Sequence, residues 1–104
     1  MMDFLKNIFA KREAIDLQKI IDEGAFLVDV RTPSEFDSGH VKGSVNIPLD
    51  TIRGKLAKFK NKKNIIVFCK SGGRSMMAKQ LLDQNGIENV INGGTWVKIS
   101  QYVK

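Results

Sequence analysis

Two short and almost fully apolar runs stand out along the chain, at residues 26–30 (FLVDV) and 65–68 (IIVF). Continuous apolar runs of this length are typical of parallel strands that helices cover on both faces. Residues 45–47 and 89–91 are weaker strand candidates. The pattern therefore predicts a buried sheet whose strands come from separate parts of the chain.

Helix signals alternate with these runs. Thr32 is expected to cap a helix in which Pro33 takes the first position and Glu35 completes a capping box. The clearest helix is predicted over residues 75–85, with Gly86 as its stop. Further helices are expected over residues 16–23, from Asp50 or Thr51 through Phe59, and over 95–102. Strands that alternate with helices imply a parallel α/β sheet.

Residues 1–13 are predicted to form an amphipathic helical extension of a domain that occupies residues 14–104. The apolar side chains of this segment fall on one face of a helix: Phe4, Leu5, Ile8 and Phe9. Basic residues would flank that face, so two interpretations stay open. The helix packs on the domain, or it makes peripheral contact with a membrane surface or a partner.

Composition places the chain among ordinary globular domains. Its 104 residues suit a single domain, with 42% hydrophobic and 27% charged residues. No apolar run approaches the roughly 20 residues of a transmembrane span, and no secretion signal is recognisable, so we expect a cytoplasmic protein. One Cys and one His exclude an internal disulfide, a Cys-based zinc site and a polyhistidine metal centre.

The chain carries a net charge of +6, which suits an anionic substrate, surface or nucleic acid. The densest basic cluster consists of Lys55, Lys58, Lys60, Lys62 and Lys63. We interpret this cluster as the solvated end of a helix and its loop, with a partner-binding patch as the alternative. Because no zinc-finger or aromatic RNA-binding motif accompanies it, no nucleic-acid partner is expected.

The segment that carries chemistry is CKSGGRS, residues 69–75. Cys69 ends the most apolar strand, where parallel α/β sheets place their ligand sites, and a glycine-containing loop and a helix start follow. The loop amides, the helix N-terminus and the charges of Lys70 and Arg74 should all lower the thiol pKa. Gly72 and Gly73 let the loop curl around a single atom. The segment therefore predicts a nucleophilic thiolate that attracts sulfur oxyanions.

Two plainer interpretations compete with this one. A lone Cys at the end of a strand is often a small buried hydrophobe, and Arg74 could form a salt bridge with a surface acid. The flanking loop favours the functional interpretation of Cys69.

Several segments in order resemble a single-domain rhodanese, a sulfurtransferase. They cover about residues 14–97: LVDVR at 27–31, EF at 35–36 with GHVKGSVNIP at 39–48, the loop at 69–75, and NGG at 92–94 with Trp96 as a closing turn. The resemblance implies an α/β fold, a five-stranded parallel sheet flanked by helices on both faces. Their joint order and spacing make the match specific, although each segment alone would be weak.

The resemblance also implies a site and a reaction. Cys69 would be the nucleophile, and the loop would hold a persulfide and receive the anionic donor through Lys70, Ser71, Gly72, Gly73 and Arg74. Sulfane sulfur would pass from a donor such as thiosulfate to cyanide or a thiol, with no metal or organic cofactor. Because the chain has no second Cys, a thiol acceptor such as glutathione or thioredoxin must come from outside.

Four residues near the loop are expected to be structural. The resemblance to rhodaneses implies that Asp29 and Arg31 support the fold near the site. The alternative is that Arg31 contacts the substrate directly. The ring of His40 is expected to bond the backbone in a turn rather than to act as a base, and Trp96 is expected to pack in the core.

Two other function classes remain open. A Cys-dependent phosphatase or arsenate reductase would use a similar loop, but there five residues separate Cys from Arg, whereas four separate Cys69 from Arg74. A rhodanese-fold interaction or persulfide-relay module is the second alternative, and the retained Cys69 argues against its inactive form.

Overall fold

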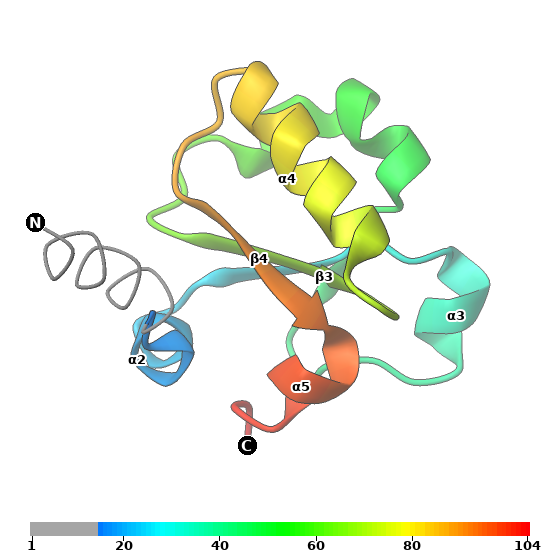
Figure 1. The fold of residues 1–104 in the computed structure, drawn as a ribbon, viewed down its shortest axis with the longest axis vertical. Helices are drawn as coiled ribbons and strands as arrows, with labels where there is room; N and C mark the ends of the chain where they lie inside the picture. The colour runs from blue at the N-terminus through cyan, green and yellow to red at the C-terminus, as the bar shows by residue number, and fades with distance from the viewer. Residues whose placement is uncertain (1–14) are drawn as a thin grey trace, which may run out of the picture.

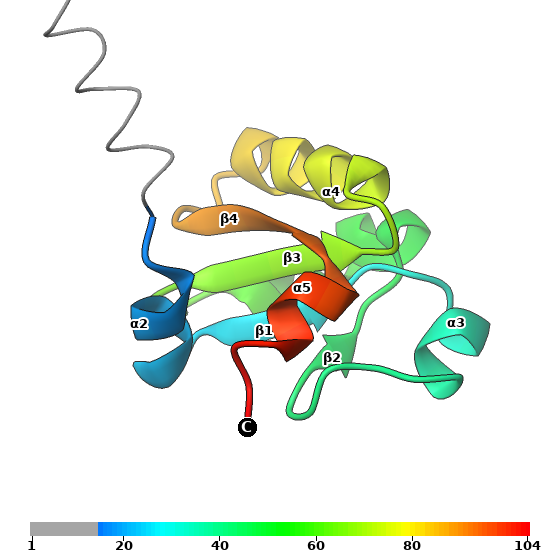
Figure 2. The same cartoon turned by 60° about the horizontal axis from the view of Figure 1, so that its bottom comes forward.

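The computed structural model describes residues 15–104, so the helix predicted over residues 1–13 lies outside the described part. Four strands form one parallel sheet in the order β2-β1-β3-β4. They are β1 (Phe26–Asp29), β2 (Val45–Asn46), β3 (Ile65–Cys69) and β4 (Val90–Thr95). The α/β class with a parallel sheet is confirmed, and the described residues form one strand fewer than the resemblance implied (Figures 1 and 2).

Five helices lie within residues 15–104, and the start predicted at Thr32 is confirmed. They are α2 (Leu17–Asp22), α3 (Pro33–Asp37), the 3-10 helix η1 (Leu49–Phe59), α4 (Gly73–Gln84) and α5 (Trp96–Ser100). The capping box of Thr32 and Glu35 is present in full, and Asp16 caps α2 by accepting a hydrogen bond from the Lys19 amide. η1 is kinked at Lys55. No helix within residues 15–104 is long and apolar enough to cross a membrane.

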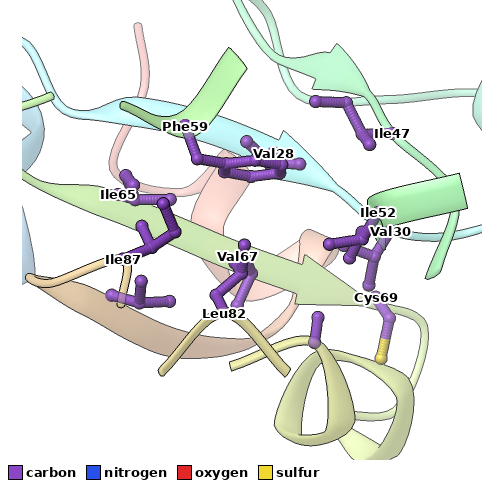
Figure 3. Packing of buried hydrophobic residues seen from close by; sticks show 12 residues of the cluster. Val28, Val30, Ile47, Ile52, Phe59, Ile65, Val67, Cys69, Leu82 and Ile87 are labelled. Carbon is purple, nitrogen blue, oxygen red and sulfur yellow. The ribbon is translucent and has the colours of Figure 1, made fainter. Parts of the chain in front are cut away.

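One face of the sheet packs against α4 and η1 (Figure 3). Val28 and Val67 point to this side from the two central strands and lie fully buried among Ile52, Phe59 and Leu82. Cys69 belongs to the same cluster, because it has the same parity as Val67 along β3. The core on this face therefore fixes the position of the Cys69 backbone.

The other face packs against α2 and α5, as Figure 2 shows on the side of the sheet away from α4. Leu27, Ile66 and Phe68 alternate with the residues of the first face and contact Leu17 and Ile99. Both faces of the sheet are thus covered, which explains why the runs of β1 and β3 are apolar at every position except Asp29.

Among the boundaries that differ from the sequence-based expectation, two have a clear physical reason. The helix predicted from Ser75 begins at Gly73, because Gly72 adopts a left-handed conformation (φ 97°) and serves as its N-cap. Residues 92–94, expected as a closing turn, belong to β4, which bulges where it pairs with Val67 and Phe68. A Cβ on Gly93 would lie 2.8 Å from side-chain atoms of Ile66 and Ile99, so this position requires glycine.

The basic cluster lies at the far end of the sheet from Cys69. Lys58, Lys60, Lys62 and Lys63 are exposed around the end of η1 and the turn into β3, and Lys55 is partly exposed. A surface hollow of about 500 Å³ lies there, between the turn at residues 59–62 and the one at residues 85–89. The lysines thus surround the end of η1 and its loop, and their exposure fits both the solvated end and the partner-binding patch.

Candidate active site

The candidate nucleophile sits at the junction of β3 and α4. Cys69 is the last residue of β3, and the chain turns through Lys70, Ser71 and Gly72 before α4 begins at Gly73. Figure 3 shows its sulfur at the carboxyl end of the strand, beside the start of α4. The positive φ of Gly72 turns the backbone N–H groups of the loop inward.

The Cys69 sulfur is enclosed by hydrogen-bonding groups. The Gly72 amide donates to Sγ at 3.0 Å, and the hydroxyl of Ser75 lies 3.6 Å from the sulfur. Both Cys69 and Ser75 are fully buried. The sulfur therefore lies within a cradle of protein donors.

These contacts set the charge state of the thiol. Burial raises the pKa of Cys69, but hydrogen bonds from the Ser75 hydroxyl and from the amides of Ser75, Gly72 and Ser71 together outweigh it. The pKa of Cys69 is thus lowered below the usual value of a cysteine thiol. The lowering increases the thiolate fraction at neutral pH, and the thiolate is the nucleophilic form.

Of the other predicted loop residues, Lys70, Ser71 and Gly73 are exposed and form the rim around the sulfur. Arg74 is half-buried and pairs with Glu35, which completes the capping box of α3, through two bonds of 2.7 and 3.0 Å. The salt bridge considered for Arg74 from the sequence is therefore formed. Its cation is shared with a carboxylate, while Lys70 makes no ion pair within residues 15–104.

The Arg74 guanidinium, with the Thr32 amide and hydroxyl, lowers the pKa of Glu35 from 4.5 to about 2. A carboxylate with a lowered pKa in the folded state stabilises the fold above pH 4.5, and this contribution is lost as the pH falls toward 2. We expect Glu35→Gln to melt below the wild type at pH 7, and the difference between the two melting temperatures to shrink as the pH falls from 4.5 toward 2. A constant difference in thermal unfolding across this range would contradict the pairing.

Ser75 and Asn92 are site residues that the sequence did not single out. The Ser75 hydroxyl lies 2.7 Å from Asn92 Oδ1 in β4, and the Gly94 amide donates to the same oxygen at 3.0 Å. Ser75 has a sequence signal, since it stands in the first turn of the helix after the Cys69 loop. Asn92 was noted only as part of the expected closing turn, and its contact with Ser75 depends on the bulge in β4.

Asp29 and Arg31 form a buried ion pair behind the site. Arg31 Nε lies 2.9 Å from both Asp29 carboxylate oxygens, and its terminal nitrogen donates to Asp29 at 2.6 Å and to the Gly39 carbonyl at 2.7 Å. The guanidinium also stacks on Trp96, 4.5 Å from the ring centroid. Nε and one terminal nitrogen of Arg31 are thus held by Asp29 and Gly39, which supports the structural role expected for it.

His40 is likewise engaged with the fold. Its Nδ1 lies 2.9 Å from the Phe36 carbonyl, and its ring stacks on Phe36 with centroids 3.8 Å apart. A carbonyl oxygen only accepts, so Nδ1 is the protonated nitrogen in this contact. The predicted bond between the ring and the backbone is confirmed.

Comparison with known proteins supplies the family. A model of the rhodanese-like domain family matches residues 13–95. The chain belongs to the rhodanese family. Thiosulfate sulfurtransferase PspE of Escherichia coli is 36% identical over 69 residues, covering 64% of this rhodanese-like chain and 66% of that protein. A sulfurtransferase of Allochromatium vinosum is 32% identical over 76 residues, covering 72% of this chain and 71% of that protein.

Solved rhodanese structures share the fold. An E. coli rhodanese with anions superposes with a TM-score of 0.67 at 33% identity, over 74% of this chain and 93% of that one. The human single-domain sulfurtransferase TSTD1 gives a TM-score of 0.70 at 25% identity, over 85% and 92%. The chain spans 54% of the length of the uncharacterized Bacillus subtilis protein YqhL, to which it is 37% identical.

Proposed function

We propose that this rhodanese-like domain transfers sulfane sulfur from an anionic donor such as thiosulfate to cyanide or a thiol, through a persulfide on Cys69. The observation that carries the proposal is the Cys69 sulfur at the end of β3, which accepts the Gly72 amide at 3.0 Å and has a lowered pKa. The similarity to proteins named thiosulfate sulfurtransferase supports the same reaction class.

In the first step, the Cys69 thiolate attacks the outer sulfur of thiosulfate. A sulfur–sulfur bond forms to Sγ, the bond inside thiosulfate breaks, and sulfite leaves with its electron pair. The negative charge then resides on the outer sulfur of the persulfide. In the second step, cyanide or a thiolate attacks that outer sulfur, and the Cys69 thiolate is released. The cycle needs no general base once Cys69 is a thiolate, the form that its lowered pKa favours.

The loop would stabilise the negative charge of the persulfide and attract the anionic donor. The amides that surround Sγ would hold the outer sulfur of the persulfide, and Lys70 would attract the donor from the rim. A unit charge pair at about 4 Å gains about 1 kcal/mol in water and about 4 at a surface-like dielectric. Arg74 contributes less charge than an unpaired arginine, since Glu35 neutralises it. Because Cys69 is buried, the donor must insert its outer sulfur into the loop.

Intact-mass spectrometry tests the proposal directly. After incubation with thiosulfate and removal of the excess, we expect a gain of one sulfur, about 32 Da, because the persulfide is a covalent intermediate. Cyanide should remove the added mass and release thiocyanate. An unchanged mass would contradict the proposal. Hydrolysis of an aryl phosphate without any mass gain would instead support the phosphatase alternative.

A protein acceptor is favoured by a second observation. Met76 and Met77 follow the loop directly on α4 and are 54% and 58% exposed. Exposed methionines adapt to varied apolar surfaces, so they suit the docking of a thiol-bearing protein beside the site. This surface supports the relay form of the function, in which the persulfide sulfur passes to a protein such as thioredoxin.

A further inference from the structure

The hydroxyl of Ser75 faces more acceptors than it can serve. Its Oγ lies 2.7 Å from Asn92 Oδ1, 3.0 Å from the Gly72 carbonyl and 3.5 Å from the Gly94 carbonyl. The Cys69 sulfur also lies 3.6 Å from this Ser75 oxygen. A hydroxyl carries one proton, so Ser75 can donate well to one of these groups at a time.

Asn92 is an acceptor at this point rather than a donor. Its side-chain oxygen also accepts the Gly94 amide at 3.0 Å, and the reversed amide orientation would place two donors against each other. Asn92 Oδ1 is therefore fixed in place, and it is the shortest acceptor contact of the Ser75 hydroxyl.

We propose that Asn92 is a positioning residue that competes with the Cys69 sulfur for the hydroxyl proton of Ser75. With Cys69 as a thiol, the S–H donates to Ser75 Oγ, and Ser75 donates to Asn92. With Cys69 as a thiolate, the hydroxyl turns to the sulfur and leaves Asn92 with the Gly94 amide alone. Asn92 thus favours the thiol form and opposes the loop amides, which favour the thiolate.

The competition would change through the catalytic cycle, and in this respect the inference rests on the proposed function. Once Sγ is bonded to a second sulfur, the charge lies on the outer atom, and the Ser75 proton returns to Asn92. The hydroxyl would turn toward the sulfur again each time the acceptor regenerates the thiolate. No proton leaves the network in either step.

The charged groups around the Cys69 sulfur lie on elements other than β4, the strand that carries Asn92. They are Lys70 in the loop, Arg74 on α4 with Glu35 on α3, and the Asp29–Arg31 pair on β1. Asn92 is neutral, so its replacement by another neutral residue leaves this electrostatic field unchanged. A shift of the thiol pKa in such a variant would therefore report on the hydrogen bonds.

The test measures the Cys69 pKa from the pH dependence of its alkylation by iodoacetamide. Asn92→Leu removes the competing acceptor at similar size, so the pKa should fall by about half to one pH unit, the value of one neutral hydrogen bond. Asn92→Ala removes the same acceptor with a smaller neutral side chain, so the pKa should again fall. This second variant keeps the test decisive if Asn92→Leu does not fold.

A double variant separates the hydrogen bond from general disturbance of the loop. On a Ser75→Ala background, which itself raises the pKa, Asn92→Leu should cause no further shift. An equal shift with and without Ser75, or a rise in Asn92→Leu, would overturn the inference. The pKa measurement does not depend on sulfur transfer. If the wild type never gains about 32 Da with thiosulfate, the proposed function is refuted, even where the pKa shifts agree with the hydrogen-bond competition.

Discussion

Replacing Cys69 with Ser should reduce thiosulfate:cyanide sulfurtransferase activity by at least about a thousandfold, to the background rate. The Ser hydroxyl fits the space of the thiol and can accept the Gly72 amide in its place. It is not ionised at neutral pH, however, and it cannot form a persulfide with the donor sulfur. The initial rate of thiocyanate formation measures the loss, and the intact mass of the variant should stay constant with thiosulfate.

The same variant separates the enzyme from the interaction module. Cys69 is the one Cys of the chain, so no second thiol can take over the reaction. Thermal unfolding provides the control, because the near-isosteric replacement should leave the melting temperature close to that of the wild type. If the folded variant retains sulfurtransferase activity, the persulfide mechanism is wrong. If it loses that activity but keeps full biological activity in cells, the domain acts through binding.

The elements of this fold could be predicted from local patterns to a large extent. The apolar runs of β1 and β3 mark strands that are buried on both sides, and Thr32 and Glu35 reveal the start of α3 by a contact within four residues. Local signals of this kind depend on neighbouring positions only. The extent of β4 was underestimated because residues 92–94 look like a turn, and they stay in the strand only because Gly93 fits between Ile66 and Ile99.

The location of the candidate site could be predicted from the sequence, but the hydrogen-bond and ion-pair partners of its residues could not. The position of Cys69 at the end of an apolar strand, before two glycines, indicates the loop and its inward amides. The partners of the loop come from distant segments: Glu35 precedes Arg74 by 39 positions, and Asn92 follows Ser75 by 17. No local pattern specifies such pairs, so the identity of Glu35 as the acid that shares the charge of Arg74 emerged only from the structure.

The buried ion pair behind the loop should dominate the stability of this small domain. Arg31→Met should lower the free energy of unfolding by about 3–5 kcal/mol, because it leaves the Asp29 carboxylate buried without its cation. Asp29 has no exposed surface and Arg31 is 4% exposed, so water cannot replace the lost contacts. Small domains are stable by only about 5–15 kcal/mol, and urea denaturation should therefore show a large fall in the midpoint.

The double variant Asp29→Asn/Arg31→Met is the matched control for this cost. In the wild type, Asp29 Oδ1 accepts a hydrogen bond of 3.0 Å from the backbone amide of residue 31. The side-chain oxygen of Asn can accept the same bond, but Asn carries no charge. The double variant should therefore be more stable than Arg31→Met alone, because the uncompensated charge has been removed. Equal instability of the two would show that lost packing on Trp96, rather than the buried charge, sets the cost. If the folded double variant transfers sulfur as fast as the wild type, Arg31 makes no direct contact with the substrate and acts only through its contacts with Asp29, Gly39 and Trp96.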